Sequence, residues 1–113
     1  MRKVAVTRTN NSVVKRVIVH ECKEGVYVFR CSSLEDGSAT GDWWYESVAD
    51  AEDACRDDFG IGPDDWEYID DPLEGCQQDW IAPVRVKGRN TGQPQWGQYE
   101  RLEEGVWKDV EPS

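Results

Sequence analysis

The sequence of 113 residues lacks any apolar run near the length of about 18 that a membrane-spanning helix needs. Its first residues, MRKVAVTRTNNS, include bases but not the apolar segment of about 7 to 15 residues that follows them in a secretion signal. These absences predict a cytoplasmic protein that does not enter a membrane. At this length we expect a single domain over residues 1–113.

The sequence also lacks CxxC and CxxH pairs, which excludes the common zinc-ribbon and thioredoxin-type motifs. The separations between its four cysteines, 9, 24 and 21 residues, match no compact disulfide framework. Because no secretion signal precedes them, we expect them to be reduced thiols. They are Cys22, Cys31, Cys55 and Cys76.

Basic residues are nearly missing from residues 46–79, where Arg56 is the one base among thirteen acids. Residues 1–45 carry seven bases and five acids, and residues 80–113 carry five of each. The net charge of −10 therefore comes from one acidic block. A field of this sign repels nucleic acid and anionic lipid, so neither is expected as a direct partner.

What the sequence does contain is a clear set of strand patterns. SVVKRVIVHEC and VYVFRC are rich in β-branched and aromatic residues and are separated by KEG, which predicts a hairpin with a three-residue loop and a positive φ at Gly25. This register places Val19 opposite Phe29. One face would then carry Val17, Val19, Phe29 and Cys31, and the other Ile18, His20, Cys22, Val26 and Val28. The segment WWYE predicts a third strand.

A helix is predicted after this strand. Ser47 is a typical N-cap, and Asp50 stands three residues later as in a capping box. A buried stripe at helical spacing would then end at Gly60 as C-cap. Its members are Val48, Ala51, Cys55 and Phe59.

The remaining segments are less sharply defined. DDWEYI predicts a short strand, and DWIAPVRV predicts another, in which Pro83 indicates an edge or a bulge. The first eleven residues are polar enough for a mobile lead-in, with KVAV as a short edge strand in the alternative. Over residues 89–113 we leave the structure open, because YERLEEGVWKDV fits either a short helix or a hairpin split at Gly105.

Together these elements predict an α+β fold. A β-meander of three strands, one helix and one or more further strands would form a mainly antiparallel sheet with the helix packed on one face. The pattern WWYESVADAEDACRDDFGI resembles a strand-helix unit of small uncharacterised bacterial proteins of the acidic immunity-protein type, over residues 42–80. The resemblance implies no catalytic residue.

Two arrangements of side chains suggest a catalytic or metal-binding site. His20 and Cys22 lie two apart on one strand, as a nucleophilic pair or two ligands of a soft metal would require, against the alternative that both are packing residues. Paired aspartates suit hard cations, but no window has the spacing of an EF-hand loop. Acid-base catalysis would need a deep cleft and one distinct acid pair, which nothing selects. We therefore predict no enzyme, no cofactor and no metal site.

The leading hypothesis is a protein-binding module that docks a basic protein surface, as an inhibitor or immunity protein would. Tryptophan and tyrosine are enriched in interface hot spots, and two of them stand within the acidic block. The predicted binding residues are Asp57, Asp58, Asp64, Asp65, Trp66, Tyr68, Asp70 and Asp71. The alternatives are a structural or regulatory homo-oligomer, such as a homodimer, and a small enzyme that uses His20 and Cys22.

Overall fold

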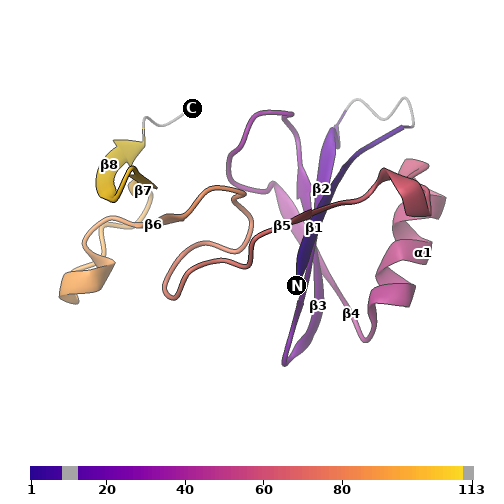
Figure 1. Cartoon of the computed structure of the whole chain (residues 1–113), viewed down its shortest axis with the longest axis horizontal. Helices are drawn as coiled ribbons and strands as arrows, with labels where there is room; N and C mark the ends of the chain where they lie inside the picture. The colour runs from indigo at the N-terminus through magenta and orange to yellow at the C-terminus, as the bar shows by residue number, and fades with distance from the viewer. Residues whose placement is uncertain (9–12, 111–113) are drawn as a thin grey trace. The chain divides into compact units, whose positions relative to one another are not determined.

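The computed structural model describes residues 1–8 and 13–110, apart from the side chain of Asn90. Contacts group the chain into two compact units, Met1–Asp71 (unit 1) and Pro72–Ser113 (unit 2), and each is described by itself. The single domain expected over residues 1–113 stays a prediction. The fold is α+β with mainly antiparallel sheet, as the sequence predicts (Figure 1). No helix of the described residues is long and apolar enough to cross a membrane.

Unit 1 contains a five-stranded antiparallel sheet in the order β4-β3-β2-β1-β5. Its strands are β1 (Arg2–Val6), β2 (Arg16–Cys22), β3 (Gly25–Cys31), β4 (Gly41–Tyr45) and β5 (Glu67–Ile69). The expectation of a mobile lead-in or an edge strand is wrong for β1, because β2 and β5 pair with its two sides. Residues 9–12 of the expected lead-in lie outside the described residues.

The β2–β3 hairpin is present, but its predicted register is wrong by one residue. Cys22 pairs with Gly25 across a two-residue turn, so Val19 lies opposite Val28 and not opposite Phe29. A one-residue shift moves every side chain of one strand to the other face. As a result, Val17 and Val19 share their face with Val26 and Val28. Ile18, His20, Phe29 and Cys31 share the opposite face.

Gly25 explains the shorter turn. Its φ of 131° is open to glycine alone, and the indole of Trp44 from β4 covers the position that a side chain would occupy. The Trp44 Nε1 atom donates a hydrogen bond to the Glu24 carbonyl at 3.1 Å. The tight turn therefore depends on a residue of the neighbouring strand, which the local sequence does not indicate.

The predicted helix is confirmed as α1 (Val48–Phe59), which lies on one face of the sheet (Figure 1). The Ser47 hydroxyl accepts a hydrogen bond from the Asp50 amide, and Gly60 ends the helix with a φ of 69°. The buried stripe packs on the Val17–Val19 face of the sheet. Its buried members are Ala51, Cys55 and Phe59, and Val48 is half-buried against them.

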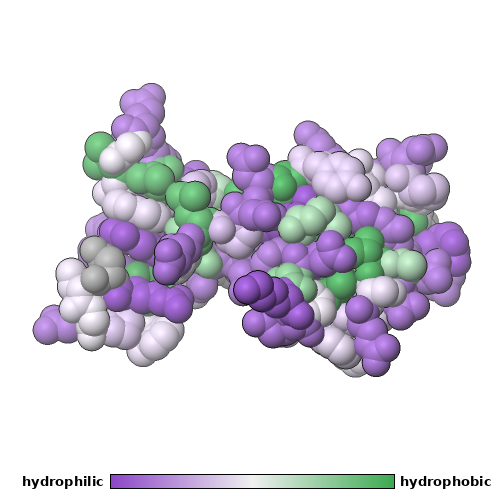
Figure 2. Space-filling view, turned by 60° about the horizontal axis from the view of Figure 1, so that its bottom comes forward, coloured by the Kyte–Doolittle hydropathy of each residue, from purple (hydrophilic) through white to green (hydrophobic). Residues whose placement is uncertain are grey.

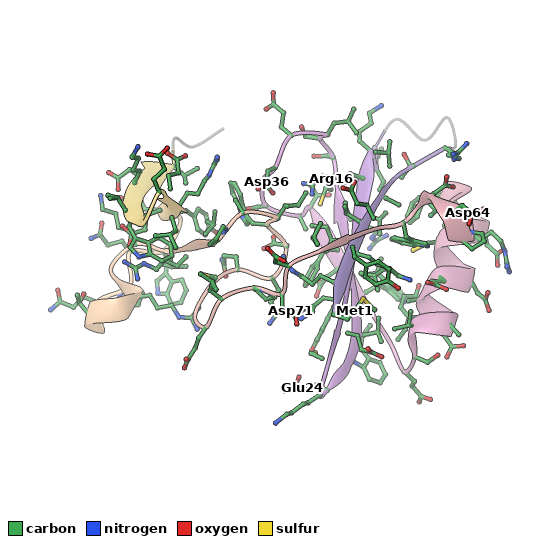
Figure 3. All side chains as sticks on the ribbon, in the orientation of Figure 1. Met1, Arg16, Glu24, Asp36, Asp64 and Asp71 are labelled. Atoms are coloured by element: carbon green, nitrogen blue, oxygen red, sulfur yellow. The ribbon has the colours of Figure 1, made fainter. Side chains whose placement is uncertain are left out.

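The opposite face of the sheet carries polar side chains among its apolar ones. Ile18 and Cys31 are buried there, as are Arg16 and His20. Arg16 donates hydrogen bonds to the carbonyls of Ser33 and Glu35, so the loop after β3 satisfies part of its guanidinium (Figure 3). Both faces are thus covered in part, as expected from their apolar content.

Unit 2 contains a three-stranded antiparallel sheet in the order β6-β7-β8. Its strands are β6 (Val84–Val86), β7 (Tyr99–Glu103) and β8 (Val106–Val110). The strand predicted for DWIAPVRV is therefore confined to its last three residues, and Pro83 precedes it. The two alternatives for YERLEEGVWKDV resolve to the hairpin, which turns at Glu104 and Gly105 with φ values of 51° and 79°. A short 3-10 helix, η2 (Arg89–Thr91), stands between β6 and β7.

Candidate functional site

The predicted binding residues occupy three places in unit 1. Asp57 and Asp58 lie in the last turn of α1, and Asp64 and Asp65 in the 3-10 helix η1 (Pro63–Asp65) that follows it. Trp66 and Tyr68 lie at the start of β5, and Asp70 and Asp71 follow its end. Figure 3 shows Asp64 beside α1 and Asp71 beside Met1. The acids therefore do not form one continuous array, because β5 separates the first four from the last two.

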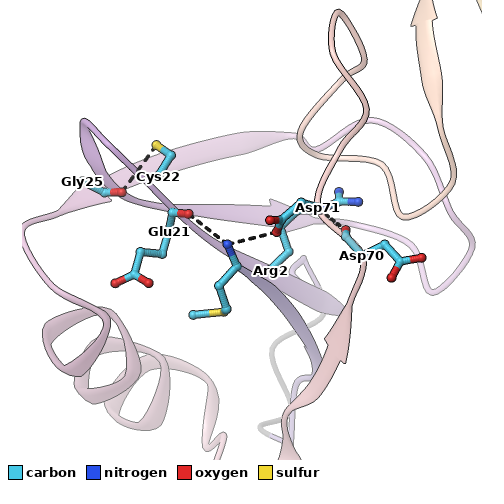
Figure 4. A network of polar contacts seen from close by, with 7 residues as sticks. Arg2, Glu21, Cys22, Gly25, Asp70 and Asp71 are labelled. Carbon is cyan, nitrogen blue, oxygen red and sulfur yellow. Dashed lines mark hydrogen bonds and ion pairs between the residues drawn. The ribbon is translucent and has the colours of Figure 1, made fainter.

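Two of these acids are bonded within the fold. Asp65 accepts a hydrogen bond from the Gly62 amide at 2.7 Å and pairs with Arg8, and these contacts lower the pKa of its carboxyl. Asp71 pairs with the Met1 amino group at 2.9 Å, which lowers the pKa of that carboxyl (Figure 4). Both carboxylates therefore support the fold. Asp65, whose side chain is 16% exposed, is poorly placed to meet a partner, whereas that of Asp71 is 63% exposed.

The same region also fixes the chain through backbone groups. The Met1 amino group donates to the Glu21 carbonyl, and the Arg2 Nε atom donates to the Asp70 carbonyl at 2.7 Å (Figure 4). These bonds tie the residues after β5 to β1 and to the end of β2. Asp70 is thus held by its main chain, while its side chain is exposed.

Trp66 and Tyr68 meet at Lys3, whose side chain is buried. The Lys3 Nζ atom lies 5.0 Å from the ring centroid of Trp66 and 5.9 Å from that of Tyr68, and it pairs with Glu52 of α1. Burial lowers the pKa of this ammonium. Trp66 is half-buried against the core, whereas Tyr68 is 71% exposed. Only Tyr68 of the pair is free to provide a large contact area.

The solvent side of α1 carries a row of acids that we call the acidic ridge: Asp50, Asp53 and Asp57. Their spacing of three and four residues places them along one face of the helix, and all three are exposed. Arg56 is the one base of the helix. Its Nη2 atom lies 3.4 Å from the Asp53 Oδ1 atom, and its Nε atom lies 3.8 Å from the Asp57 Oδ1 atom. Asp58 is one step further round the helix and lines a different surface. Sequence reasoning included Asp57 but missed Asp50 and Asp53, although the helical period indicates them.

A pocket of about 230 Å³ lies between β3, β4 and the C-terminal half of α1. It was not predicted, because the residues that form it are distant in sequence and the expected hairpin register put Val28 on the other face. The pocket contains one base, Arg30, and one acid, Asp58. The other lining residues are Val28, Trp43, Tyr45, Ala54, Cys55 and Phe59.

Trp43 and Trp44 point to opposite faces of β4, as expected of adjacent strand residues, and Trp43 is the one on the helix side. Trp43 is nevertheless 59% exposed and Trp44 is 47% exposed. β4 is also an edge strand of the sheet. Figure 2 shows, on the visible face, hydrophobic side chains in green that reach the surface among hydrophilic ones in purple.

A second, smaller groove of about 90 Å³ lies on the other side of α1. Arg56 and Asp53 border it, together with Trp66 and Pro63, the first residue of η1. Its size leaves room for a small polar group but not for an aromatic ring. The lining shows that the acidic ridge and η1 are neighbours, so the exposed Asp64 extends the ridge's negative surface.

His20 and Cys22 lie on the same face of β2, as the strand period requires. Desolvation is the main cause that raises the pKa of the Cys22 thiol, whereas an activated nucleophile needs a lowered pKa. Its Sγ atom contacts the Gly25 carbonyl at 3.5 Å (Figure 4). All four cysteines are free thiols. Over residues 1–8 and 13–110, no group of three His, Cys, Asp or Glu side chains is arranged to hold a metal ion.

Comparisons with protein-family models, curated proteins and solved structures found no match for this chain.

Proposed function

We propose that the chain is a protein-binding module whose acidic ridge, with Asp64 beside it, docks a basic surface of another protein. One observation carries the proposal: acids stand on α1 where they disfavour the helix. Asp53 and Asp57 are like charges four residues apart, and Asp57 lies in the last turn, at the negative end of the helix dipole. Each such placement costs a few tenths of a kcal/mol to about 1 kcal/mol.

Local charges offset this cost only in part. Arg56 contacts both Asp53 and Asp57, but exposed ion pairs contribute about 0 to 1 kcal/mol. Asp50 lies in the first turn, where the helix dipole favours an acid, but folding alone gives no reason for Asp53 and Asp57. A basic partner does, because it would meet all three at once and steer association at a high rate. An inhibitor or immunity protein that occludes a cationic site would act in this way.

The experiment uses a triple variant, Asp50→Asn, Asp53→Asn and Asp57→Asn. The tagged wild-type chain should retain one or more basic proteins from a cell lysate at low salt and release them at about 1 M salt, where the Debye length is about 3 Å. The triple variant should retain much less. Its melting temperature should change little, because relieved repulsion at Asp53 and Asp57 offsets the lost first-turn charge of Asp50. An unchanged melting curve then shows that lost binding is not caused by unfolding.

The matched control changes three exposed acids of unit 1, none of which lies on α1 or η1: Glu21→Gln, Glu24→Gln and Glu35→Gln. Both triple variants raise the net charge equally. If the control loses the same proteins, total charge is responsible and the ridge is not the docking surface. If the ridge variant retains them all, the proposal is wrong.

A second candidate function is a homo-oligomer, which the exposed tryptophans of edge strand β4 favour. Two copies could pair their β4 strands and cover Trp43 and Trp44. Light scattering in low and high salt separates the two candidates. A dimer that persists in high salt supports the oligomer, and a monomer with salt-sensitive partner binding supports docking.

A further inference from the structure

We propose that the pocket between β3, β4 and α1 is a binding site for one neutral phenol ring. Arg30 would donate a hydrogen bond to the phenol oxygen, and Asp58 would accept one from the phenol O–H. The proposal does not rest on docking at the acidic ridge. It rests on the size of the pocket, its aromatic walls and the hydrogen-bonding groups within it.

The size and lining of the pocket suit a single ring. Its volume of about 230 Å³ exceeds the roughly 150 Å³ of an engineered apolar cavity that binds benzene. Val28 and Phe59 are buried members of the core, and Trp43 and Tyr45 add two aromatic faces from β4. Rings stack or meet edge to face in such surroundings. Trp43 is mostly exposed although it belongs to the helix side of the sheet, so its ring has a face to offer.

Arg30 supplies an unused donor. Its Nε atom is buried and has no hydrogen-bond partner among the described residues. The guanidinium lies over the Trp43 ring, 5.5 Å from the centroid. Gly41 pairs with Arg30 across β3 and β4, and the guanidinium lies over it. A buried N–H without a partner is unfavourable, so a small turn of the Arg30 guanidinium toward an occupant that brings an acceptor is favoured.

The negative charge of Asp58 decides which kind of ligand acceptor suits the pocket. A carboxylate ligand would meet Asp58 inside the pocket and a chain with a net charge of −10 around it. A carbonyl would satisfy Arg30 but would leave the exposed Asp58 carboxylate bonded to water alone. A phenol hydroxyl both accepts and donates while remaining neutral. Burial raises the pKa of Tyr45 and raises that of Cys55 to about 12, so neither adds a negative charge at neutral pH.

The test titrates the full chain with p-cresol and follows the indole N–H resonances by two-dimensional NMR. The Trp43 resonance should shift along a saturable curve in the millimolar range, while that of Trp66, which borders the groove on the other side of α1, should not. Toluene, which lacks the hydroxyl and pairs with neither Arg30 nor Asp58, and benzoate, an anion that Asp58 repels, should each bind at least about tenfold more weakly. Equal binding of toluene, or no saturable shift of Trp43, would overturn the proposal.

Two pairs of variants locate the ring. Arg30→Met should weaken p-cresol binding about tenfold, whereas Arg56→Met, which removes the same charge on the other side of α1, should leave it unchanged. Ala54→Leu should fill the pocket and abolish binding, whereas Ala49→Leu on the exposed side of the helix should not. Dispersed spectra and melting temperatures show whether each variant is folded. If Arg30→Met and Ala54→Leu are folded and bind normally, the site is not this pocket.

A further titration distinguishes the sources of the ring. An acetylated and amidated Lys-Tyr-Lys peptide presents the phenol as a tyrosine side chain beside positive charge. Tighter binding than p-cresol that weakens with salt would assign the pocket to a tyrosine of a basic protein, and weaker binding would assign it to a free small phenol. Failure of both probes overturns the phenol site and leaves docking at the acidic ridge unaffected.

Discussion

In unit 1 ten buried side chains form a cluster between the sheet and α1, whereas the buried apolar residues described in unit 2 are Trp80, Val84 and Val86. Unit 2 is held by contacts of another kind. Arg85 lies over the ring of Trp107, 3.8 Å from its centroid, and pairs with Glu100 at 2.7 Å. Segments of about 40 residues bury too little surface for a large apolar core. A single polar contact should therefore matter more in unit 2 than in unit 1.

The two hairpin turns give the largest contrast. We expect Gly25→Ala to destabilise unit 1 by about 3 kcal/mol, because the φ of 131° is strained for alanine and the new Cβ atom would collide with the Trp44 indole. Gly105→Ala in unit 2 should cost about 1 to 2 kcal/mol, because its φ of 79° is also unfavourable but no atom lies within 4 Å of the new side chain. Hydrogen exchange of β2–β3 and β7–β8 amides measures both.

The Trp44 indole N–H resonance is an additional readout for these variants. It should move in Gly25→Ala because the hydrogen bond to the Glu24 carbonyl is lost, and it should stay in place in Gly105→Ala. If both variants lose the same free energy of unfolding and the Trp44 resonance does not move, the Trp44 indole over Gly25 does not stabilise the turn.

Removing from each unit one base that lies over an aromatic ring gives an intermediate effect. Arg85→Met should destabilise unit 2 by about 2 kcal/mol, because the Glu100 side chain, 13% exposed, would lose its partner and Trp107 its cation. Lys3→Met should change unit 1 by less than about 0.5 kcal/mol, because burial already disfavours the ammonium and Glu52, 36% exposed, stays hydrated. Urea unfolding followed by the tryptophan resonances of each unit separates the two. A larger loss from Lys3→Met would reverse the comparison.

The smallest expected effect is the loss of stability at low pH that follows from protonation of Asp65. Its pKa is lower in the folded chain than the value of about 3.9 in an unfolded one. Its contribution to stability is therefore complete above that value and is lost as the pH falls through the lower folded pKa. Asp65→Asn should flatten the fall of melting temperature below about pH 4, and the neighbouring exposed Asp64→Asn should not. Parallel curves for both variants would contradict this role of Asp65.

The helix was predictable in full because its signals are local: a capping serine, a repeating apolar stripe and a terminal glycine all lie within Ser47–Gly60. The α+β class followed from the order of such signals. The register of β2 and β3 was not predictable, because KEG fits both a two-residue and a three-residue loop. The shorter loop is favoured by Trp44, which lies on the neighbouring strand β4 and covers Gly25. The inner position of β1 was equally hidden, since β5 pairs with it from more than sixty positions away.

The candidate site shows the same limit. Composition identified the acidic block but not the roles of its members, since Asp65 and Asp71 find their cationic partners at Arg8 and the Met1 amino group, near the start of the chain. The pocket depends on Arg30, Trp43 and Asp58 coming together from three elements. Only the tertiary fold brings such residues together, and none of them forms a motif alone.

The position of β4 bears on how the protein avoids aggregation. An edge strand leaves a row of backbone N–H and C=O groups without a neighbour in its sheet, which is a template for fibrillar growth when apolar side chains flank it. Here Trp43 and Trp44 stand between the exposed carboxylates of Asp42 and Glu46. Mutual repulsion between copies would hold these edges apart at neutral pH and fade as the solution approaches the isoelectric point near 4.4. Colloidal stability and partner recognition would then both depend on the same negative charge. A substitution that alters this charge would therefore change both properties at once.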